Sequence, residues 1–202
     1  MSAVRTLTLA DATLPRAGVL RDVVLILGAS LATALAARIA VPVPWSPVPL
    51  TGQTFAVLLS GAVLGARRAV LAQALYLVAG AMGLPFFAGG LGGPLVLAGP
   101  TGGFLVAFPL AAAVTGLLAE RGWDRHFATT LVAMLLGSAV ILVSGLAVLS
   151  RFVPVDRLLA AGLLPFLPGD VLKAAAAALV LPAAWRFANG RPSREDRGGS
   201  GA

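Results

Sequence analysis

Two charged side chains in an otherwise apolar segment are the first candidates for chemistry. Asp170 and Lys173 follow Pro168-Gly169 and precede a run of alanines. A spacing of three residues places both on one helix face, within reach of each other. Insertion scales assign about 2.5–3.5 kcal/mol to a charge at the centre of a membrane helix, so such residues face a cavity or a partner. The pair therefore predicts a ligand site; the alternative is that Asp170 caps the helix and Lys173 neutralises it.

The residue sets that support catalysis are missing from the sequence. There is no cysteine, and the single histidine, His126, stands beside Arg125. Asp170 has no second carboxylate near it in the sequence, whereas acid–base or nucleophilic catalysis needs such a partner. No Gly-x-x-x-x-Gly-Lys-Ser/Thr phosphate loop occurs either. We therefore expect that the protein is not an enzyme and uses no metal or cofactor.

The composition indicates which elements must position the charged pair. Hydrophobic residues make up 58% of the 202 residues and charged residues 11%, against about 25% charged residues in a soluble domain. The sequence therefore predicts an all-α, multi-pass protein of the cell membrane, surrounded by the lipid bilayer. The net charge of +7 does not indicate nucleic acid, because the arginines stand singly or in pairs between apolar stretches.

Six apolar stretches approach the length of about 20 residues that a helix needs to cross a bilayer. Prolines and glycines separate them, and we expect helices at about 20–40, 53–66, 69–84, 101–119, 127–149 and 170–187. The first stretch loosely resembles a signal peptide, but cleavage would leave only further membrane segments, so we interpret it as a membrane helix. The predicted organisation is a cytoplasmic arm (1–19), a six-helix membrane domain (20–188) and a disordered cytoplasmic tail (189–202).

The distribution of arginines predicts that both termini are cytoplasmic. With six crossings and an inside N-terminus, eleven arginines fall on the inside and three fall outside, namely Arg38, Arg151 and Arg157. This distribution follows the positive-inside rule. A count of five or seven helices would mix the two sets, so the charge pattern also supports six.

Two external connections, at 41–49 and 85–100, are unusual because they are uncharged and rich in proline, glycine and aromatic residues. Apolar, non-helical backbone near a membrane is tolerated where it packs into protein or lines a cavity. We therefore predict that these segments form a lid over an outward-facing substrate pocket. The alternative is that they lie as stiff loops in the headgroup layer, with Trp45 as an interfacial anchor.

Four groups of residues match the motifs of a known family. They are Pro42-Val43-Pro44-Trp45-Ser46-Pro47-Val48-Pro49-Leu50-Thr51-Gly52-Gln53-Thr54 (PxPxxPVPxTxQT), Leu75-Tyr76-Leu77 with Gly83-Leu84-Pro85-Phe86-Phe87-Ala88-Gly89-Gly90, Gly99-Pro100-Thr101-Gly102-Gly103-Phe104 (GPTxGF) and Pro168-Gly169-Asp170-Val171-Leu172-Lys173 (PGDxxK). In this order, over about residues 20–188, they resemble the BioY family, the biotin-specific S components of energy-coupling factor (ECF) transporters. The chain departs from many relatives at Gly89 and Gly90, where those carry a polar residue, so neither position offers a side-chain ligand here.

The resemblance implies a six-helix, substrate-binding membrane subunit that captures biotin from outside the cell. Such a subunit delivers biotin through an ECF-type complex with a transmembrane coupling subunit and cytoplasmic ATPase subunits on other chains. The missing phosphate loop agrees with ATP hydrolysis by another polypeptide. The alternative function is that of a self-sufficient channel or secondary carrier for a small organic solute.

Biotin needs a mostly apolar pocket with a few convergent polar groups for its ureido ring and carboxylate. The candidate substrate-binding residues share the predicted outer half of the membrane domain: Asp170, Lys173, Gln53, Arg38, Phe86, Phe87, Thr101 and Tyr76. The alternatives are helix capping for Gln53 and Thr101, snorkelling to the interface for Arg38 and plain packing for the two phenylalanines. For Tyr76, inside the third helix, a hydrogen bond within the core is the favoured interpretation.

Small residues recur at spacings of three and four along the first predicted helix: Ala29, Ala32, Thr33, Ala36 and Ala40. Such spacings produce a smooth helix face, and small residues permit close helix packing in lipid. The family resemblance implies an Ala-x-x-x-Ala surface for docking to the coupling subunit, which Ala32 and Ala36 fit. The alternative is packing within an alanine-rich bundle.

Overall fold

The computed structural model describes residues 8–14 and 18–189, and in this part of the chain almost all regular structure is helical. The main helices are α2 (Val19–Ala36), α3 (Gln53–Leu64), α4 (Ala66–Ala81), α6 (Gly102–Val106), α7 (Phe108–Glu120), α8 (Phe127–Leu149) and α10 (Phe166–Asn189). Shorter elements are α1 (Leu9–Thr13), β1 (Ala40–Val41), β2 (Leu50–Thr51), η1 (Ala88–Gly90), α5 (Pro94–Ala98), η2 (Trp123–Arg125) and α9 (Val155–Gly162).

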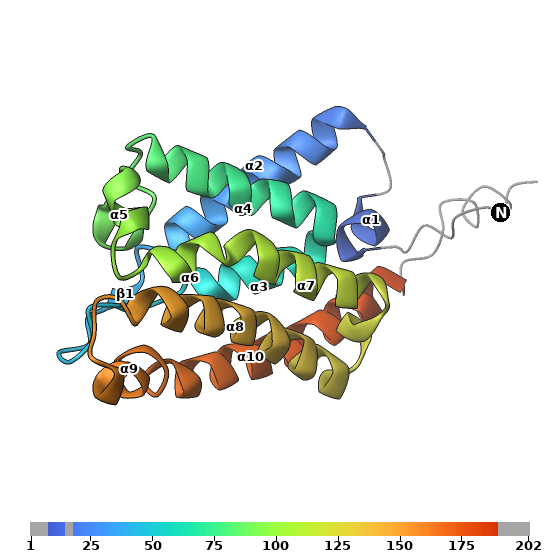
Figure 1. Cartoon of the computed structure of the whole chain (residues 1–202). Coiled ribbons are helices and arrows are strands. Elements are labelled where there is room, and N and C mark those ends of the chain that lie inside the picture. The colour runs from blue at the N-terminus through green and yellow to red at the C-terminus, as the bar shows by residue number, and fades with distance from the viewer. Residues whose placement is uncertain (1–7, 15–17, 190–202) are drawn as a thin grey trace, which may run out of the picture.

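The main helices run alongside one another between two different ends (Figure 1). One end, which we call the hairpin end, carries the antiparallel pair β1–β2 together with α5 and α9. The opposite end carries α1 and is called the α1 end. Helix α7 packs against α3, α4 and α8, so it occupies the centre of the bundle.

Several helices have the length and composition of membrane spans. Among the described residues, four helical stretches qualify: Val19–Ala36, Gly102–Glu120, Phe127–Leu149 and Val155–Ala188. Helix α3 is apolar but has 12 residues. These helices confirm the expected all-α class and agree with a membrane location. The predicted tail, 189–202, lies outside the described residues apart from Asn189, which ends α10, and the predicted N-terminal arm contains α1.

The connection between α3 and α4 consists of Gly65 alone. Its φ of 80° lies in the region that favours glycine, and a Cβ there would lie 2.7 Å from Oε1 of Glu120. The Glu120 carboxylate instead accepts a hydrogen bond from the Ala66 backbone N–H at 2.9 Å, which satisfies a free donor at the start of α4. Because α4 begins at Ala66, Arg67 and Arg68 lie in its first turn and not in the loop we predicted.

Helix α10 begins earlier than the sequence predicted. The expected start near Asp170 is wrong, because the helix starts at Phe166 and continues through Pro168-Gly169. Proline is tolerated in the first helical turn, where its missing N–H would have had no intrahelical partner. Asp170 is therefore inside the helix, and the capping role considered for it is excluded.

A buried polar cluster joins three helices within the apolar bundle. The Nε2 group of Gln73 in α4 donates hydrogen bonds to Thr33 Oγ1 in α2 and to Ser60 Oγ in α3, both at 3.1 Å. All three side chains are buried. Side-chain hydrogen bonds of this kind hold helices together where no water competes, so the cluster fixes the rotation of α2 against α3 and α4.

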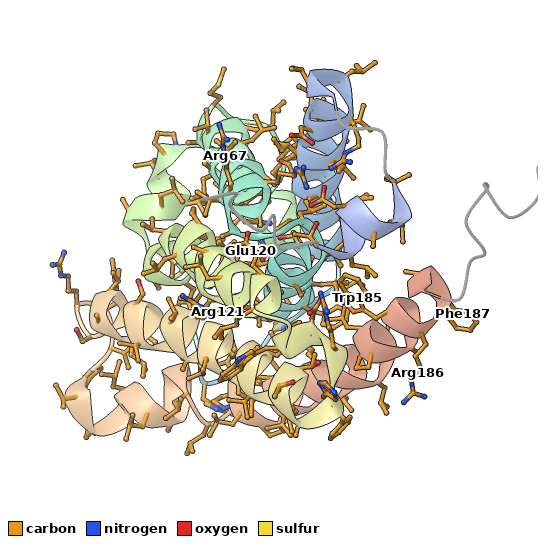
Figure 2. The ribbon with its side chains drawn as sticks, turned by 90° about the vertical axis from the view of Figure 1, so that its right-hand side faces the viewer. Arg67, Glu120, Arg121, Trp185, Arg186 and Phe187 are labelled. Carbon is orange, nitrogen blue, oxygen red and sulfur yellow. The ribbon has the colours of Figure 1, made fainter. Side chains whose placement is uncertain are left out.

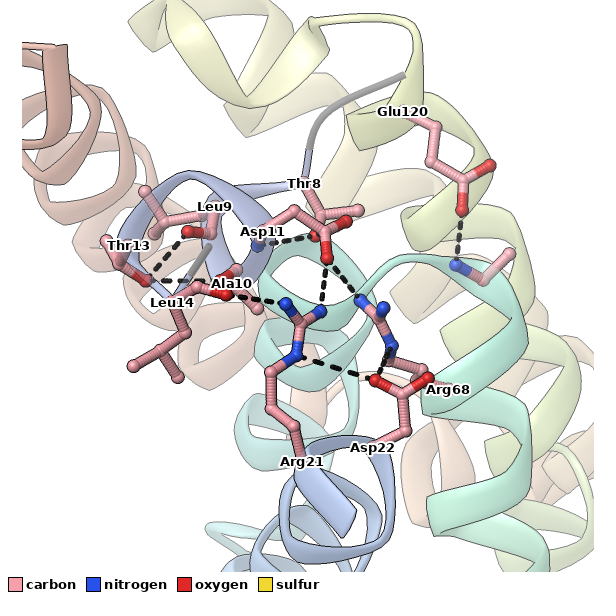
Figure 3. Close-up of polar contacts among 11 residues, drawn as sticks. Thr8, Leu9, Ala10, Asp11, Thr13, Leu14, Arg21, Asp22, Arg68 and Glu120 are labelled. Carbon is pink, nitrogen blue, oxygen red and sulfur yellow. Dashed lines mark hydrogen bonds and ion pairs between the residues drawn. The ribbon is translucent and has the colours of Figure 1, made fainter. Parts of the chain in front are cut away.

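A second polar cluster attaches α1 to the rest of the bundle (Figure 3). The Asp11 carboxylate accepts hydrogen bonds from Thr8, from Arg21 in α2 and, at 2.9 Å, from Nη1 of Arg68 in α4. Nε of Arg68 also lies 3.0 Å from Oδ1 of Asp22. Burial alone would raise the pKa of Asp11, but the hydrogen bonds from Arg21, Thr8 and Arg68 outweigh it and lower this pKa to about 2.

We expect the Asp11 cluster to stabilise the fold above mildly acidic pH. The pKa of Asp11 is lower in the folded chain, about 2, than its ordinary value of 3.8. Its contribution is therefore complete above about pH 4 and is lost as the pH falls toward 2. Asp11→Asn should lower the melting temperature at pH 7 by roughly 2–4 °C, because a partly exposed ion pair contributes about 1 kcal/mol.

The matched control is Asp156→Asn, since Asp156 lies 4.0 Å from Arg157 and both side chains are more than three-quarters exposed. Thermal unfolding in detergent, followed from pH 7 to pH 2.5, compares the two variants with the wild type. Equal melting temperatures for both variants across this pH range would contradict the assignment.

Candidate substrate site

A cavity of about 150 Å³ opens at the hairpin end of the bundle. It lies between the segment from Pro47 to Thr51, the start of α3, the turn at Phe87–Ala88, and helices α6, α7, α8 and α10. Aromatic and aliphatic side chains form most of its wall: Phe87, Phe104, Phe108, Phe166, Val48, Leu91, Val96, Leu105, Ile141 and Leu142. A mostly apolar, concave site with few polar groups is typical of a small-molecule binding pocket.

The charged pair predicted from the sequence lies in the wall of this cavity. Nζ of Lys173 lies 3.6 Å from Oδ1 of Asp170, and both residues line the cavity. The Lys173 ammonium also donates hydrogen bonds to the Thr51 carbonyl at 2.9 Å and to Thr54 Oγ1 at 2.8 Å. Lys173 therefore joins α10 to β2 and to the first turn of α3.

Asp170 has a second partner on a different helix. Its side chain is 7% exposed, and its Oδ2 atom accepts a hydrogen bond from the hydroxyl of Ser138 in α8. A buried carboxylate is tolerated only where opposite charge and hydrogen bonds compensate its lost hydration. Ser138 and Lys173 provide that compensation from two directions.

Gln53 connects the cavity to the protein interior. It begins α3, lines the cavity and is 3% exposed. Its Nε2 group donates to the Tyr76 hydroxyl, which in turn donates to the Phe86 carbonyl at 3.2 Å. Neither Gln53 nor Thr101 makes a side-chain capping hydrogen bond, so the capping alternatives are not observed.

Tyr76 and the two phenylalanines form one aromatic group behind the cavity wall. Tyr76 is fully buried, and its ring centroid lies 6.1 Å from that of Phe86 and 5.7 Å from that of Phe87. Of the three, Phe87 lines the cavity. Phe87 packs closely on α4, since a Cβ at Gly80 would lie 2.3 Å from its ring. Tyr76 thus makes a hydrogen bond within the core, as its position inside the third predicted helix suggested. Its bond to the Phe86 carbonyl holds the Phe86–Phe87 turn.

Arg38 lies outside the cavity wall. Its Nη2 group donates to the Pro85 carbonyl at 2.7 Å, which joins the end of α2 to the connection after α4. The structure brings Gln53, Phe87, Thr101, Asp170 and Lys173 together around the cavity. Arg38, Phe86 and Tyr76 instead contact the segments that surround it.

Sequence reasoning did not identify two polar partners of the charged pair. Thr54 stands in the proline-rich motif, so its side chain could have been suspected from the motif. Ser138 stands 32 residues before Asp170 in an apolar helix, and no motif includes it. Its role follows only from the packing of α8 against α10.

The small-residue face of α2 differs from the predicted one. Ala32 is exposed and Ala36 half-buried, but Thr33 is fully buried and bonds to Gln73. Gly28, one turn before Ala32, is also exposed, and a Cβ there would have no neighbour within 4 Å. The outward small face therefore consists of Gly28, Ala32 and Ala36, and the inclusion of Thr33 was wrong.

Comparisons with known proteins agree with these features. Residues 5–190 match the model of the BioY family. A "Probable biotin transporter BioY" of Pyrococcus horikoshii is 39% identical over 148 residues, which cover 73% of this chain and 86% of the relative. A "Biotin transporter BioY" of Thermotoga maritima is 42% identical over 141 residues, covering 69% and 82%.

A third relative, "Biotin transporter BioY" of Rhodobacter capsulatus, is 38% identical over 188 residues, which cover 86% of this chain and 96% of the relative. The fold is that of a solved crystal structure, the S-component for biotin from an ECF-type ABC transporter. That structure superposes with a TM-score of 0.72 at 21% identity and covers 83% of this chain and 92% of its own. Because the family model and the relatives cover most of its length, this chain belongs to the BioY family.

Proposed function

We propose that this chain is the substrate-binding membrane subunit of a biotin uptake transporter. The observation that carries the proposal is an apolar cavity with the Lys173–Asp170 pair in its wall, in a chain of the BioY family. The relatives are named biotin transporters, and the structural neighbour is described as the S-component of an ECF-type transporter. A transmembrane coupling subunit and cytoplasmic ATPase subunits on other chains would complete the complex.

The chemistry of the cavity suits the parts of biotin. Phe87, Phe104 and Phe108 offer apolar surface for the thiophane ring. Oδ1 of Asp170, the carboxylate oxygen that Ser138 does not engage, would accept a hydrogen bond from a ureido N–H. Lys173 would supply positive charge and a donor to a polar end of the ligand, because its ammonium group carries three N–H donors.

The proposed arrangement in the membrane has six crossings, formed by α2, α3, α4, the α6–α7 pair, α8 and α10. The hairpin end would face outward, with the connections at 41–49 and 85–100 as a lid over the cavity, whose lining includes Pro47, Val48, Phe87 and Leu91. The α1 end would face the cytoplasm. Exposed arginines at that end, including Arg67, Arg121 and Arg186 (Figure 2), support this orientation by the positive-inside rule.

The first prediction from the proposed function is that Lys173→Ala weakens biotin binding at least tenfold. A hydrogen bond to a charged group contributes roughly 1.5–3 kcal/mol, which corresponds to about tenfold or more. Lys173→Arg should also bind poorly, because the guanidinium fork differs in shape and reach. Titration of the purified protein in detergent with labelled biotin measures the effect. Arg157→Ala, an exposed cation at the same end of the bundle, serves as the control. Wild-type affinity in Lys173→Ala would refute the site.

A second prediction separates a binding subunit from a self-sufficient carrier. Liposomes that contain this chain alone should bind biotin without accumulating it, because no phosphate loop is present to couple ATP hydrolysis. Uptake assays with and without the coupling and ATPase subunits measure this difference. Biotin movement by the chain alone would favour the channel or carrier instead.

The third prediction concerns docking of the coupling subunit on α2. We propose that Ala32 and Ala36, extended by Gly28, form the docking face, because small residues allow close helix approach in lipid. Changing Ala32 and Ala36 together to Trp should abolish ATP-driven uptake in the full complex and spare biotin binding. The matched control is Val132→Trp with Leu136→Trp, two exposed positions with the same spacing on α8. Unchanged uptake in the α2 variant would exclude this surface.

A further inference from the structure

Ser138 occupies a buried position one layer behind the substrate cavity. It lies in α8, is 3% exposed and does not line the cavity, whereas Ile141 and Leu142, three and four residues later, do. The helix is closely packed here, because a Cβ at the neighbouring Gly137 would lie 2.4 Å from Thr115 Oγ1 and 2.5 Å from Leu58 Cδ2. Close packing on α7 and α3 therefore fixes the part of α8 that carries Ser138.

The Ser138 hydroxyl donates to a carboxylate on another helix, whereas three other buried hydroxyls of the bundle donate within their own helices. Thr33 donates to the Ala29 carbonyl, Thr115 to the Ala111 carbonyl and Ser60 to the Val57 carbonyl, each within its own helix. This is the ordinary arrangement for serine and threonine in helices. Ser138 donates to Oδ2 of Asp170 on α10 instead.

The two partners of Asp170, Lys173 and Ser138, differ in whether they also form hydrogen bonds to other residues. Lys173 also donates to the Thr51 carbonyl and to Thr54 Oγ1, and in the proposed function it turns part of its hydrogen-bonding capacity to biotin. Ser138 has no other hydrogen-bond partner in the described part of the chain. It is therefore the partner that would still hold the Asp170 carboxylate if the lysine turned to a ligand.

We infer that Ser138 is a positioning residue for biotin recognition and acts through Asp170. By donating to Oδ2 it fixes the plane of the carboxylate and leaves Oδ1, on the Lys173 side, to accept a hydrogen bond from the ligand. It also supplies a charge-assisted hydrogen bond that offsets the cost of keeping this carboxylate buried. The inference rests on the proposed biotin-binding function.

The primary test compares two serine-to-alanine variants in the same helix. Ser138→Ala should weaken the binding of labelled biotin about tenfold, since it removes a hydrogen bond to a charged group. Ser144→Ala removes a hydrogen bond of 2.8 Å from α8 to the Gly103 carbonyl and should leave the affinity within about twofold of wild type. Equal affinities in the two variants would overturn the inference.

A double-mutant cycle distinguishes positioning from a general structural effect. Asp170→Asn keeps one side-chain oxygen that can accept from a ureido N–H, so binding stays measurable. If Ser138 acts through the carboxylate, the effect of Ser138→Ala should shrink in the Asp170→Asn background, because contacting residues are not additive. An undiminished effect in that background would contradict the inference.

A third experiment tests whether a conservative change at Ser138 preserves biotin binding. Ser138→Thr keeps the hydroxyl donor and should bind biotin more tightly than Ser138→Ala. Loss of binding in both variants together with a large fall in melting temperature would indicate a packing role and count against positioning. Failure of the wild type itself to bind biotin would overturn the proposed function, which is a different result from a normal affinity in Ser138→Ala.

Discussion

A buried carboxylate and a partly buried ammonium group among apolar helices cannot be left without partners, and this requirement governs the arrangement of the hairpin end. Asp170 and Lys173 satisfy each other only in part, since Nζ and Oδ1 lie 3.6 Å apart. The remaining hydrogen bonds come from Ser138 in α8, from Thr54 in α3 and from the carbonyl of Thr51. Contacts with the two charged groups therefore join α3, α8, α10 and the β1–β2 segment, and the apolar cavity lies beside these contacts.

The same requirement appears along α2, which is the most exposed of the four helical stretches with the length and composition of membrane spans. Polar contacts occur at three positions: Arg21 bonds to Asp11 in the first turn of α2, Thr33 bonds to Gln73 in its last turn, and Arg38, two residues beyond the helix, bonds to the Pro85 carbonyl. Between these contacts the helix presents leucine, valine and small residues outward. Hydrogen bonds thus set its orientation, because dispersion contacts between apolar side chains have little directional preference.

The sequence was most informative where a local pattern determines the structure. Apolar stretches bounded by proline and glycine predicted the main helices, and the spacing of Asp170 and Lys173 predicted one shared face. The sequence was less informative where packing between distant segments determines the structure. The start of α10 at Phe166 was missed because Pro168-Gly169 was interpreted as a break, although proline suits a first turn. Thr33 was grouped with the small residues of the first helix because its partner Gln73 lies 40 residues away. The role of Ser138 was missed for the same reason, since Asp170 lies 32 residues away.

The three donors of the Lys173 ammonium group have a consequence for selectivity. In the structure they face the Thr51 carbonyl, Thr54 Oγ1 and the Asp170 carboxylate, so a ligand that binds there exchanges one hydrogen bond for another. The gain in free energy is then the difference between two bonds, which is small for a weak acceptor and large for an anionic one. A molecule of the right shape but with a poor hydrogen-bond acceptor would not replace the bonds from the Lys173 ammonium group to Thr51 and Thr54. Discrimination would thus arise from competition between the solute and the protein's own backbone, as well as from the fit of the cavity.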